Sequence, residues 1–404
     1  MKTVLFIGLV FPEPNSSAAG TRIIQLIHLF QAQNYKVLFA SSAQKSDFTF
    51  DLASIDVETI AIELNNSSFD DYIKQANPNI VVFDRFIAEE QFGWRVAESC
   101  PNAIRILDTE DLHCLRYARQ KAVKKSEDFQ MADLLNEPSS FREIASIYRC
   151  DLTLMISDFE MTVLTDFFKI DSKLLCYLPL FYEAKNDVIP YDDRKDFVFI
   201  GNFIHDPNYD AVLQLKNLWK SIKKQLPDTE LHIYGAYPSA KVFQLHNENE
   251  GFLIKGRAKD AYEVIENAKV LLAPLRFGAG IKGKLLEAMV VGTPSVTTAN
   301  GQEGIATTHW NGSVTNQMNE FVTNAIEIYT NKTLWEQCQK IGFEILKHKF
   351  EKSLYSLDFS KKISLLSQNL LIHRKNNFIG NLLYQNQFAS QKFMSKWIEE
   401  KNKL

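Results

Sequence analysis

Lysine, glutamate and glycine residues that could bind an anion are crowded into one short stretch of this sequence. From residue 278 to residue 287 the chain reads GAGIKGKLLE. Glycines let backbone N–H groups approach an anion closely, and the first turn of a helix carries the positive end of its dipole. The stretch therefore predicts a phosphate-binding loop with Lys282 and Lys284 as its cations. The candidate binding positions are Gly278, Gly280, Ile281, Gly283, Lys284 and Glu287.

The elements around this loop are those that a phosphate site requires. An apolar run beginning at Val270 precedes the loop, and the residues after it have helical spacing. On that helix Lys284, Glu287 and Ala288 are predicted to lie opposite an apolar stripe. The stripe comprises Leu285, Leu286, Met289 and Val290. Lys284 and Glu287 either form an exposed ion pair, or they contact a phosphate and the ribose hydroxyls, respectively.

The glycine spacing in this loop also matches G-x-G-x-x-G, the fingerprint of dinucleotide binding. A plain tight turn would use the same glycines. The strand after the helix, Ser295 to Thr298, lacks the acidic residue at its end that would hold a ribose. An NAD-binding oxidoreductase therefore stays a competing hypothesis that rests on the glycine pattern alone.

Short apolar runs alternate with amphipathic stretches along most of the chain, which predicts βα units around parallel sheets. With 404 residues and 46% hydrophobic content, the α/β chain has enough apolar material for two doubly wound domains. A polar, proline-containing stretch marks the boundary, so we expect an N-terminal domain over 1–185, a linker over 186–196 and a C-terminal domain over 197–356. A helical tail over 357–404 is expected to pack back across the domains.

Some finer expectations concern the helices. The spacing predicts one long helix from Leu112 to Leu135 and mostly helical structure from Ile305 to Phe350. In the tail, Phe393, Met394 and Trp397 are the expected apolar anchors.

Composition and charge exclude several classes of protein. A formal net charge of -4 argues against a nucleic-acid binder. Five cysteines without a C-x-x-C pair argue against a disulfide framework and a zinc site, and they favour a reducing cytoplasm. The apolar run from Val4 to Phe11 predicts a strand and not a secretion signal, because it ends at Pro12. No run reaches the roughly 18 apolar residues of a membrane-spanning helix.

Polar residues follow three strands of the first domain, where doubly wound domains bind their ligands. The candidates for the acceptor or sugar side of a cleft are Gly20, Arg22, Asp84, Arg85 and Asp108. Each charged candidate also has a plainer explanation. Arg22 fits a solvated arginine, Asp84 with Arg85 fits an interdomain salt bridge, and Asp108 fits a helix N-cap.

Longer strings around these positions resemble a known family. PLRFGAGIKGKLLEAMVVGTPSVTTANGQEGI and, upstream, FIGNFIHDPNYDAV are similar to the donor-binding domain of GT-B glycosyltransferases, in particular the large retaining family of bacterial sugar transferases. The resemblance implies two Rossmann-like domains facing a central cleft, with the diphosphate on the glycine loop and the ribose on Glu287. It places Gly256 and Arg257 near the base. The stretch DTEDLH, residues 108–113, resembles one that approaches the donor sugar, which implies a sugar contact for His113.

The sequence departs from that family at two places. Many members carry an acidic residue eight positions before the helix glutamate, where this chain has Ala279. Many also carry an Arg or Lys soon after the first strand of the donor domain, where this chain has Gly201 to His205. Lys282, Lys284 or Arg276 must then supply that charge. We interpret both departures as a variant of the site.

The predicted reaction is transfer of a sugar from a nucleoside-diphosphate sugar to an acceptor hydroxyl on a glycan, a lipid-linked or a protein-linked acceptor. The resemblance implies retention and no bound metal, and no cofactor is predicted besides the donor. His113, Lys282 and Lys284 are the candidate catalytic residues, because a departing diphosphate needs preorganised positive charge. A sugar-nucleotide epimerase and a non-catalytic nucleotide-sugar binding protein are the alternatives.

One predicted helix has a basic side, which allows weak peripheral contact with the inner face of a membrane. Its lysines are Lys216, Lys220, Lys223 and Lys224. A solvated helix face explains the same pattern.

Overall fold

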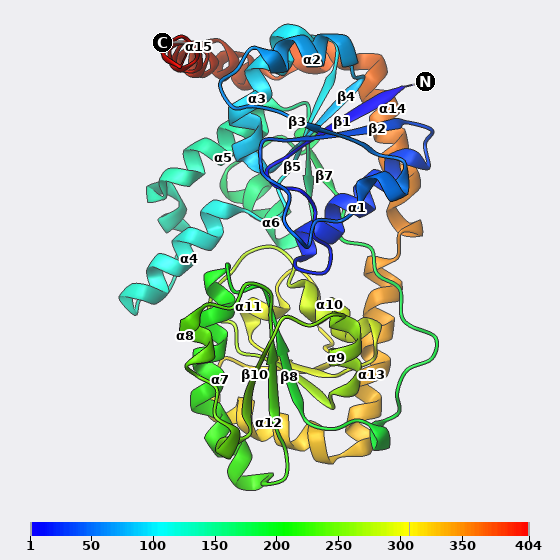
Figure 1. The fold of residues 1–404 in the computed structure, drawn as a ribbon, viewed down its shortest axis with the longest axis vertical. Coiled ribbons are helices and arrows are strands. Elements are labelled where there is room, and N and C mark those ends of the chain that lie inside the picture. The colour runs from blue at the N-terminus through cyan, green and yellow to red at the C-terminus, as the bar shows by residue number, and fades with distance from the viewer. Residues whose placement is uncertain (1, 307, 403–404) are drawn as a thin grey trace.

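The chain forms two α/β domains stacked along the long axis of the molecule (Figure 1). The computed structural model describes residues 2–306 and 308–402, apart from the side chains of residues 386–389. Each domain is built on one parallel sheet with helices on both faces (Figure 1). This arrangement explains why the strands are apolar almost throughout, since neither face of either sheet meets water.

The first domain contains a seven-stranded sheet in the order β3-β2-β1-β4-β5-β6-β7. Its strands are β1 (Thr3–Gly8), β2 (Lys36–Ser41), β3 (Glu58–Ala61), β4 (Ile80–Asp84), β5 (Ile104–Asp108), β6 (Leu152–Met155) and β7 (Leu175–Tyr177). Its helices are α1 (Ala18–Gln31), α2 (Ser68–Ala76), α3 (Arg85–Ser99), α4 (His113–Lys125), α5 (Pro138–Arg149) and α6 (Asp158–Thr162). The strand order reverses between β1 and β4, so the carboxyl ends of these strands form a crevice.

The second domain contains a six-stranded sheet in the order β10-β9-β8-β11-β12-β13. Its strands are β8 (Phe197–Ile200), β9 (Leu231–Tyr234), β10 (Phe252–Gly256), β11 (Val270–Ala273), β12 (Ser295–Thr297) and β13 (Gly312–Val314). Its helices are α7 (Asp206–Gln225), α8 (Ala240–Phe243), α9 (Ala261–Asn267), α10 (Gly283–Val290), α11 (Ala299–Gln302), α12 (Met318–Thr330) and α13 (Lys332–Ile345). Here the order reverses between β8 and β11, and the predicted phosphate loop follows β11.

Two expectations about helices were partly wrong. The long helix predicted from Leu112 to Leu135 ends at Lys125, because Ser126 has a left-handed backbone with a φ of 60°. A separate 3-10 turn, Met131–Asn136, follows it. After Ile305 the chain also forms the edge strand β13. The sequence did not predict this strand, because its three partly exposed residues contain no apolar run.

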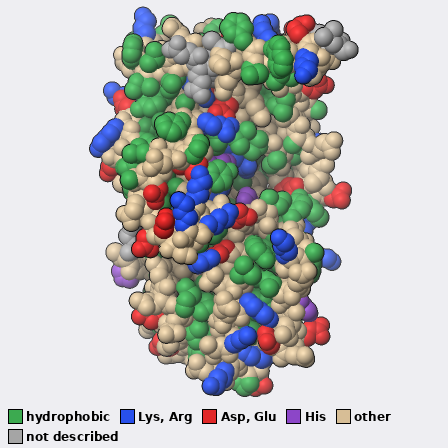
Figure 2. All heavy atoms as spheres, turned by 90° about the vertical axis from the view of Figure 1, so that its left-hand side faces the viewer, with side chains coloured by type: hydrophobic (Ala, Val, Ile, Leu, Met, Phe, Trp, Pro, Cys, Tyr) green, Lys and Arg blue, Asp and Glu red, His purple; other side chains and the backbone are tan. Residues whose placement is uncertain are grey.

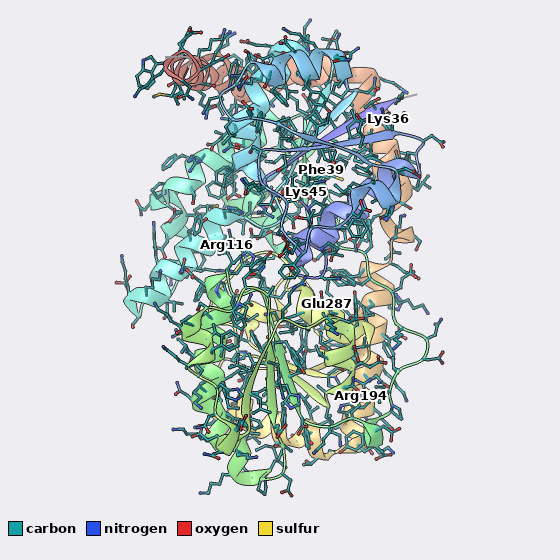
Figure 3. All side chains as sticks on the ribbon, in the orientation of Figure 1. Lys36, Phe39, Lys45, Arg116, Arg194 and Glu287 are labelled. Carbon is teal, nitrogen blue, oxygen red and sulfur yellow. The ribbon has the colours of Figure 1, made fainter. Side chains whose placement is uncertain are left out.

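The segment predicted as a linker is mostly exposed but is fixed to the second domain by Arg194. Arg194 is 2% exposed, and its guanidinium donates hydrogen bonds to the carbonyl oxygens of Ile189 (2.7 Å) and Val291 (2.6 Å). Its Nη1 also donates to Oγ1 of Thr293 at 2.5 Å. Figure 3 shows Arg194 far from the boundary between the domains. Residues 186–196 therefore belong to the surface of the second domain as much as they connect the two.

After the second domain, the chain returns to the first. Helix α14 (Ser353–Asn376) runs along the outside of the first domain (Figure 1). It buries Phe359, Ile363, Leu366 and Leu370 in the core that also contains the strands β1 and β2. The first domain is thus completed by residues from both ends of the chain.

Helix α15 (Phe378–Lys401) lies against α5 and α3, but not through the anchors that the sequence suggested. Phe393, Met394 and Trp397 are 68%, 58% and 60% exposed, so that expectation was wrong. The buried guanidinium of Arg95 contacts the helix instead, donating to Oγ of Ser395 at 3.2 Å. Within the described part of the chain, no helix has both the length and the hydropathy to span a membrane.

Candidate active site

A cleft opens between the two domains at the carboxyl ends of both sheets. It offers about 280 Å³ of space to a ligand, and residues of both domains line it. Figure 2 shows the side of the molecule where Lys and Arg side chains gather at mid-height, beside the boundary between the domains. The position is the one that strand polarity predicts for a ligand.

The glycine loop forms one part of the second-domain wall. Gly278 and Gly280 have φ angles of 148° and 62°, which glycine adopts without strain. The N–H of Gly280 donates to Oε1 of Glu160 at 2.7 Å, so it contacts the first domain. Lys282 folds back over the loop, and its Nζ donates to the carbonyl oxygen of Gly280 at 2.9 Å. Burial lowers the pKa of Lys282 to about 8, although the nearby Glu303 carboxylate acts the other way.

Helix α10 forms the adjoining part of this wall. Leu285, Leu286 and Met289 of the predicted stripe are fully buried, whereas Val290 is half-buried. Ala288 was predicted on the opposite side and is fully buried too, so the apolar face is wider than the sequence spacing indicated. Lys284 and Glu287 lie in the remaining sector and line the cleft.

The expected ion pair between Lys284 and Glu287 is absent from the described contacts. Nζ of Lys284 donates to Oδ1 of Asn208 at 2.5 Å and lies 4.3 Å from the ring centre of Phe199. Burial raises the pKa of Glu287 to about 7 against the opposing charge of Lys284. Burial likewise lowers the pKa of Lys284 to about 7. For both groups the cost of burial exceeds the stabilisation by the opposite charge. Such perturbed pKa values are typical of groups that bind a ligand.

Arg257, which the resemblance places near the base, lies on the same side of the cleft, whereas Gly256 is not among the residues that line it. The Arg257 guanidinium is 3.5 Å from the ring centre of Phe48, and Nη2 donates to Oγ of Ser16 at 3.0 Å. Gly256 is buried at the end of β10 with a φ of 74°. Arg257 therefore offers a flat cation at the mouth of the cleft, shared with the first domain.

The first-domain wall is made by residues that follow β4 and β5. Arg85, Glu110, Asp111, His113 and Arg116 line the cleft. Figure 3 shows Arg116 and Glu287 near the boundary, one from each domain. Asp111 is central to the charge arrangement: Oδ2 accepts from Nη1 of Arg116 at 2.6 Å, and Oδ1 lies 3.4 Å from Nε2 of His113. Burial alone would raise the pKa of Asp111, but Arg116 and His113 outweigh it and hold the pKa below its usual value.

His113 begins helix α4 and is 6% exposed. Burial lowers its pKa to about 4, so the imidazole is neutral at physiological pH. The helix is not capped by Asp108, as one reading of the sequence suggested. Instead Glu143 of α5 accepts from the N–H groups of His113 (3.0 Å) and Cys114 (2.9 Å), which leaves the imidazole oriented toward the cleft.

Four of the predicted acceptor-side residues lie behind this wall. Arg22 is completely buried: its Nε and Nη2 lie 3.3 Å from Oδ1 of Asp108, and Nη1 donates to the carbonyl oxygen of Pro179 at 3.0 Å. Asp84 accepts from the N–H of Leu9 at 3.1 Å and lies 3.3 Å from Nε of Arg85. These side chains hold strand ends together, and Arg85 alone of their group lines the cleft.

Gly20 is the fourth of these residues. A Cβ there would lie 2.4 Å from the carbonyl carbon of Glu13, so its glycine is required by backbone packing. The loop before it, residues 14–19, lines the cleft in its place.

Several contacts that tie the walls together were not foreseen. Arg119 of α4 donates to the carbonyl oxygen of Gly278 at 2.9 Å and to both carboxylate oxygens of Glu303 at 2.8 and 2.7 Å. Glu160 bridges the walls through Gly280 and also accepts from the N–H of Leu112 at 3.0 Å. The partners that join the two domains are more than 100 residues apart, and Leu112 and Glu160 are 48 residues apart, so no local spacing signals these contacts. Arg276, a suggested cation, instead pairs with Asp210 on the surface at 2.9 Å.

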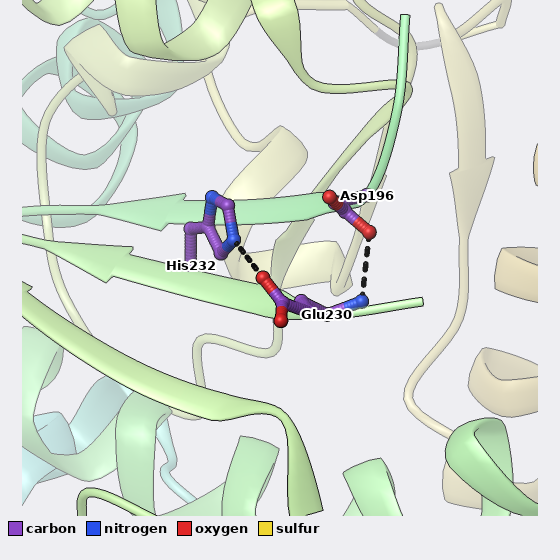
Figure 4. A group of neighbouring side chains, drawn as sticks. All are labelled: Asp196, Glu230 and His232. Atoms are coloured by element: carbon purple, nitrogen blue, oxygen red, sulfur yellow. Dashed lines mark hydrogen bonds and ion pairs between the residues drawn. The ribbon is translucent and has the colours of Figure 1, made fainter. Parts of the chain in front are cut away.

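A group of possible metal ligands lies at the opposite end of the second-domain sheet. Asp196, Glu230 and His232 have ligand atoms within 4.8 Å of one another (Figure 4). Each already has a partner: Oδ1 of Asp196 accepts from the N–H of Glu230 at 2.8 Å, and Oε2 of Glu230 lies 2.8 Å from Nε2 of His232. The group is explained by these contacts and lies away from the cleft.

Comparisons with known proteins agree with this geometry. Residues 194–331 match the family model described as Glycosyl transferases group 1. Sucrose-phosphate synthase from Thermosynechococcus elongatus superposes with a TM-score of 0.70 at 15% sequence identity, over 90% of this chain and 99% of that chain. Among curated protein sequences none matches the chain.

Two further solved structures hold ligands. The pneumococcal O-GlcNAc transferase GtfA, in complex with UDP and GlcNAc, superposes with a TM-score of 0.66 at 11% identity, over 90% of this chain and 99% of that chain. Anabaena HepE, in complex with UDP and glucose, superposes with a TM-score of 0.64 at 11% identity, over 90% and 100%. The expected GT-B fold is thereby confirmed.

Proposed function

We propose that this chain, a glycosyltransferase of the GT-B fold whose second domain matches the group 1 family, transfers a sugar from a nucleoside-diphosphate sugar to an acceptor hydroxyl. One observation carries the proposal. Lys284 and Glu287 line the cleft side by side, both largely withdrawn from water and neither paired with the other among the described contacts. A cation and a hydrogen-bond acceptor in that arrangement suit a diphosphate and the ribose attached to it.

In this mechanism the protein stabilises the departing diphosphate while positive character develops on the sugar. Lys284 and the first turn of α10 supply the positive charge, and Lys282 becomes available when a ligand displaces it from the carbonyl oxygen of Gly280. Neutral His113 donates or accepts a hydrogen bond at the sugar. The bridges made by Glu160 and Arg119 hold the two walls together, which excludes water that would hydrolyse the donor.

Several finer features belong to the same proposal. Transfer proceeds with retention and without a bound metal, as the resemblance implies. The donor is a nucleotide sugar, a class supported by the UDP and sugar bound in two structural neighbours. The acceptor is a hydroxyl group on a glycan, a lipid-linked or a protein-linked molecule. Five buried, unpaired cysteines support a cytoplasmic location. Weak membrane contact through the lysines of α7 is the least supported feature, because Lys216 pairs with Glu250 at 2.7 Å.

A thermal-shift panel of UDP, GDP, dTDP and NAD tests the ligand class. A nucleoside diphosphate at a hundred times its dissociation constant is expected to add about 2.7 kcal/mol to the free energy of unfolding. Stabilisation by NAD alone would overturn the proposal. New sugar nucleotide formed without an acceptor and without free diphosphate would favour the epimerase.

A substitution of Glu287 tests the ribose contact. Glu287→Ala removes hydrogen bonds to a carboxylate, which are worth roughly 1.5–3 kcal/mol, so the affinity for the nucleoside diphosphate is expected to fall about tenfold or more. Calorimetric titration measures it. Glu336→Ala, on the exposed face of α13, is the matched control and leaves the affinity unchanged. Equal affinities for both variants would count against the ribose role.

A further inference from the structure

Glu110 is a buried carboxyl group of the cleft. It lies in the stretch 108–113, for which the resemblance implies a sugar contact of His113 but no role for Glu110 itself. It lies in the loop between β5 and α4 and is 8% exposed. Its Oε1 is withdrawn from water and has no hydrogen-bond partner among the described residues. A buried polar atom without a partner is costly, and its retention needs an explanation.

The backbone at Glu110 is also strained. Its φ is 62°, the left-handed region that side-chain-bearing residues seldom adopt. Arg85, at the neighbouring strand end, has a φ of 68° and lines the same cleft. A left-handed backbone conformation changes the direction in which a side chain points. Two residues with this strained conformation at one cleft indicate that the direction of their side chains matters for function.

Among the described contacts, the charged neighbours of Glu110 have other partners. The nearby Asp108 is already held by Arg22, and Arg85 lies 3.3 Å from Asp84. Burial, together with the Asp108 charge, raises the pKa of Glu110 well above its usual range. The group is therefore able to act as a neutral hydrogen-bonding acid, which suits a hydroxyl group better than a phosphate.

The position of Glu110 beside the glycine loop indicates which part of a ligand it would contact. A Cβ added to Gly280 would lie 3.4 Å from the carbonyl oxygen of Glu110, so the two backbones are in contact. A sugar attached to a diphosphate on that loop and on Lys284 would start beside Gly280 and extend toward the first domain. Among the described residues of the first-domain wall, Glu110 and His113 each have a buried polar atom without a partner, and Glu110 is the one whose backbone contacts the glycine loop.

We infer that Glu110 contacts the hydroxyl groups of the donor sugar from the first-domain side of the cleft. This inference rests on the proposed function, because it places the donor diphosphate on the glycine loop. It assigns sugar recognition to a residue outside the donor domain.

The test compares sugar nucleotides with the bare nucleotides in calorimetric titrations. UDP is measured against UDP-glucose and UDP-N-acetylglucosamine, GDP against GDP-mannose, and dTDP against dTDP-glucose. Glu110→Ala is expected to lower the ratio of sugar-nucleotide to bare-nucleotide affinity about tenfold, the size of one lost hydrogen bond, and to leave bare-nucleotide affinity unchanged. Glu110→Gln keeps a neutral hydrogen-bonding group of the same length and is expected to retain most of the ratio.

Controls separate this role from a structural one. Glu127→Ala, at an exposed position of the same domain, leaves the ratio at the wild-type value. The melting temperature of Glu110→Gln is expected to stay close to that of the wild type, since a neutral amide replaces a neutral acid of the same length. Glu110→Met replaces the alanine variant if the latter does not fold.

Two results would overturn the inference: an unchanged ratio in the alanine or methionine variant, or an equal loss of affinity for bare and sugar nucleotides. If no bare nucleotide binds the wild type at all, the proposed function itself fails. The titrations therefore distinguish failure of the proposed function from failure of the inference about Glu110.

Discussion

The two walls of the cleft are built in opposite ways. The charged part of the second-domain wall is one continuous stretch, in which the glycine loop and the first turns of α10 follow each other directly along the chain; this stretch is called the continuous wall below, and residues after β8, β9 and β10 complete the wall beside it. The first-domain wall is assembled from separate strand ends, and its residues are held by groups from other elements, such as Glu143 of α5. The first kind of wall acts through local backbone geometry, whereas the second depends on tertiary contacts.

The largest effect on the reaction rate is expected from removing the positive charge of Lys284 in the continuous wall. Lys284→Met is expected to lower kcat about a hundredfold or more, because loss of one preorganised group at a developing charge costs about 10²–10³ in rate. The protein stays folded, since the substitution also removes a poorly solvated cation. Steady-state rates of donor consumption measure the effect.

Lys255→Met is the control for this substitution, since Lys255 is an exposed lysine of the same domain. It should keep the wild-type rate. A similar small loss for both variants would mean that the continuous wall does not carry the charge stabilisation, and the contrast between the walls would fail.

The contact between the walls is tested at Gly280. Gly280→Ala would place a Cβ 2.7 Å from Cβ of Asp111, so the walls must move apart. We expect kcat/KM to fall about tenfold and the unfolding free energy to fall by about 1 kcal/mol, the cost of alanine in a left-handed conformation. Kinetics and urea denaturation measure the two effects.

Gly251→Ala is the control that separates the effect of backbone strain from the effect of the contact between the walls. Gly251 has the same φ of 62° but lies at the other end of the domain, where its added Cβ would meet Nζ of Lys223 at 3.1 Å and the carbonyl oxygen of Thr229 at 3.3 Å, and no residue of the cleft. It should lose similar stability and no activity. Loss of activity in both variants would show that domain stability, and not wall contact, limits the reaction.

The smallest effect concerns Glu160, which bridges the walls. Burial, with the Asp111 charge adding to it, raises the pKa of Glu160 to about 8. A carboxyl with a raised pKa in the folded state loses its stabilising contribution as the pH rises from its ordinary pKa toward 8. The stability advantage of Glu160→Gln over the wild type is therefore expected to grow with pH, by about 1 kcal/mol per unit.

Urea unfolding at pH 5, 6.5 and 8 checks this difference. Glutamine can accept from the N–H groups of both Gly280 and Leu112, so the bridge itself is kept. A stability difference that does not change with pH would mean that Glu160 is ionised in the folded protein, and that the bridge between the walls is an anionic one.

The sequence predicted the continuous wall well and the assembled wall poorly. Lys284 and Glu287 were found because their spacing on one helix determines where they point. Arg22 and Asp108 were assigned to a ligand because a charged residue after a strand resembles a site, yet their two charges neutralise each other inside the domain. Glu110 was not selected, because its burial and strained backbone depend on elements distant in the sequence.

The same reasoning explains the errors in the fold. The sheets follow from apolar runs that local propensity reveals. The strand β13 carries no such run, and it forms because β12 offers it an edge. The interior of α14 was not identified as core, because its apolar contacts are made with the first strands of the chain.

That return of α14 has a consequence for biosynthesis. Phe359, Ile363, Leu366 and Leu370 cover part of the core around β1 and β2, yet a ribosome makes them only after the entire second domain. Until then, the apolar surface formed by the earliest residues stays open to water and to other unfinished chains. A late-made helix of the first domain therefore acts as an internal cover, and we expect the nascent chain to be prone to aggregation for as long as the second domain takes to be translated.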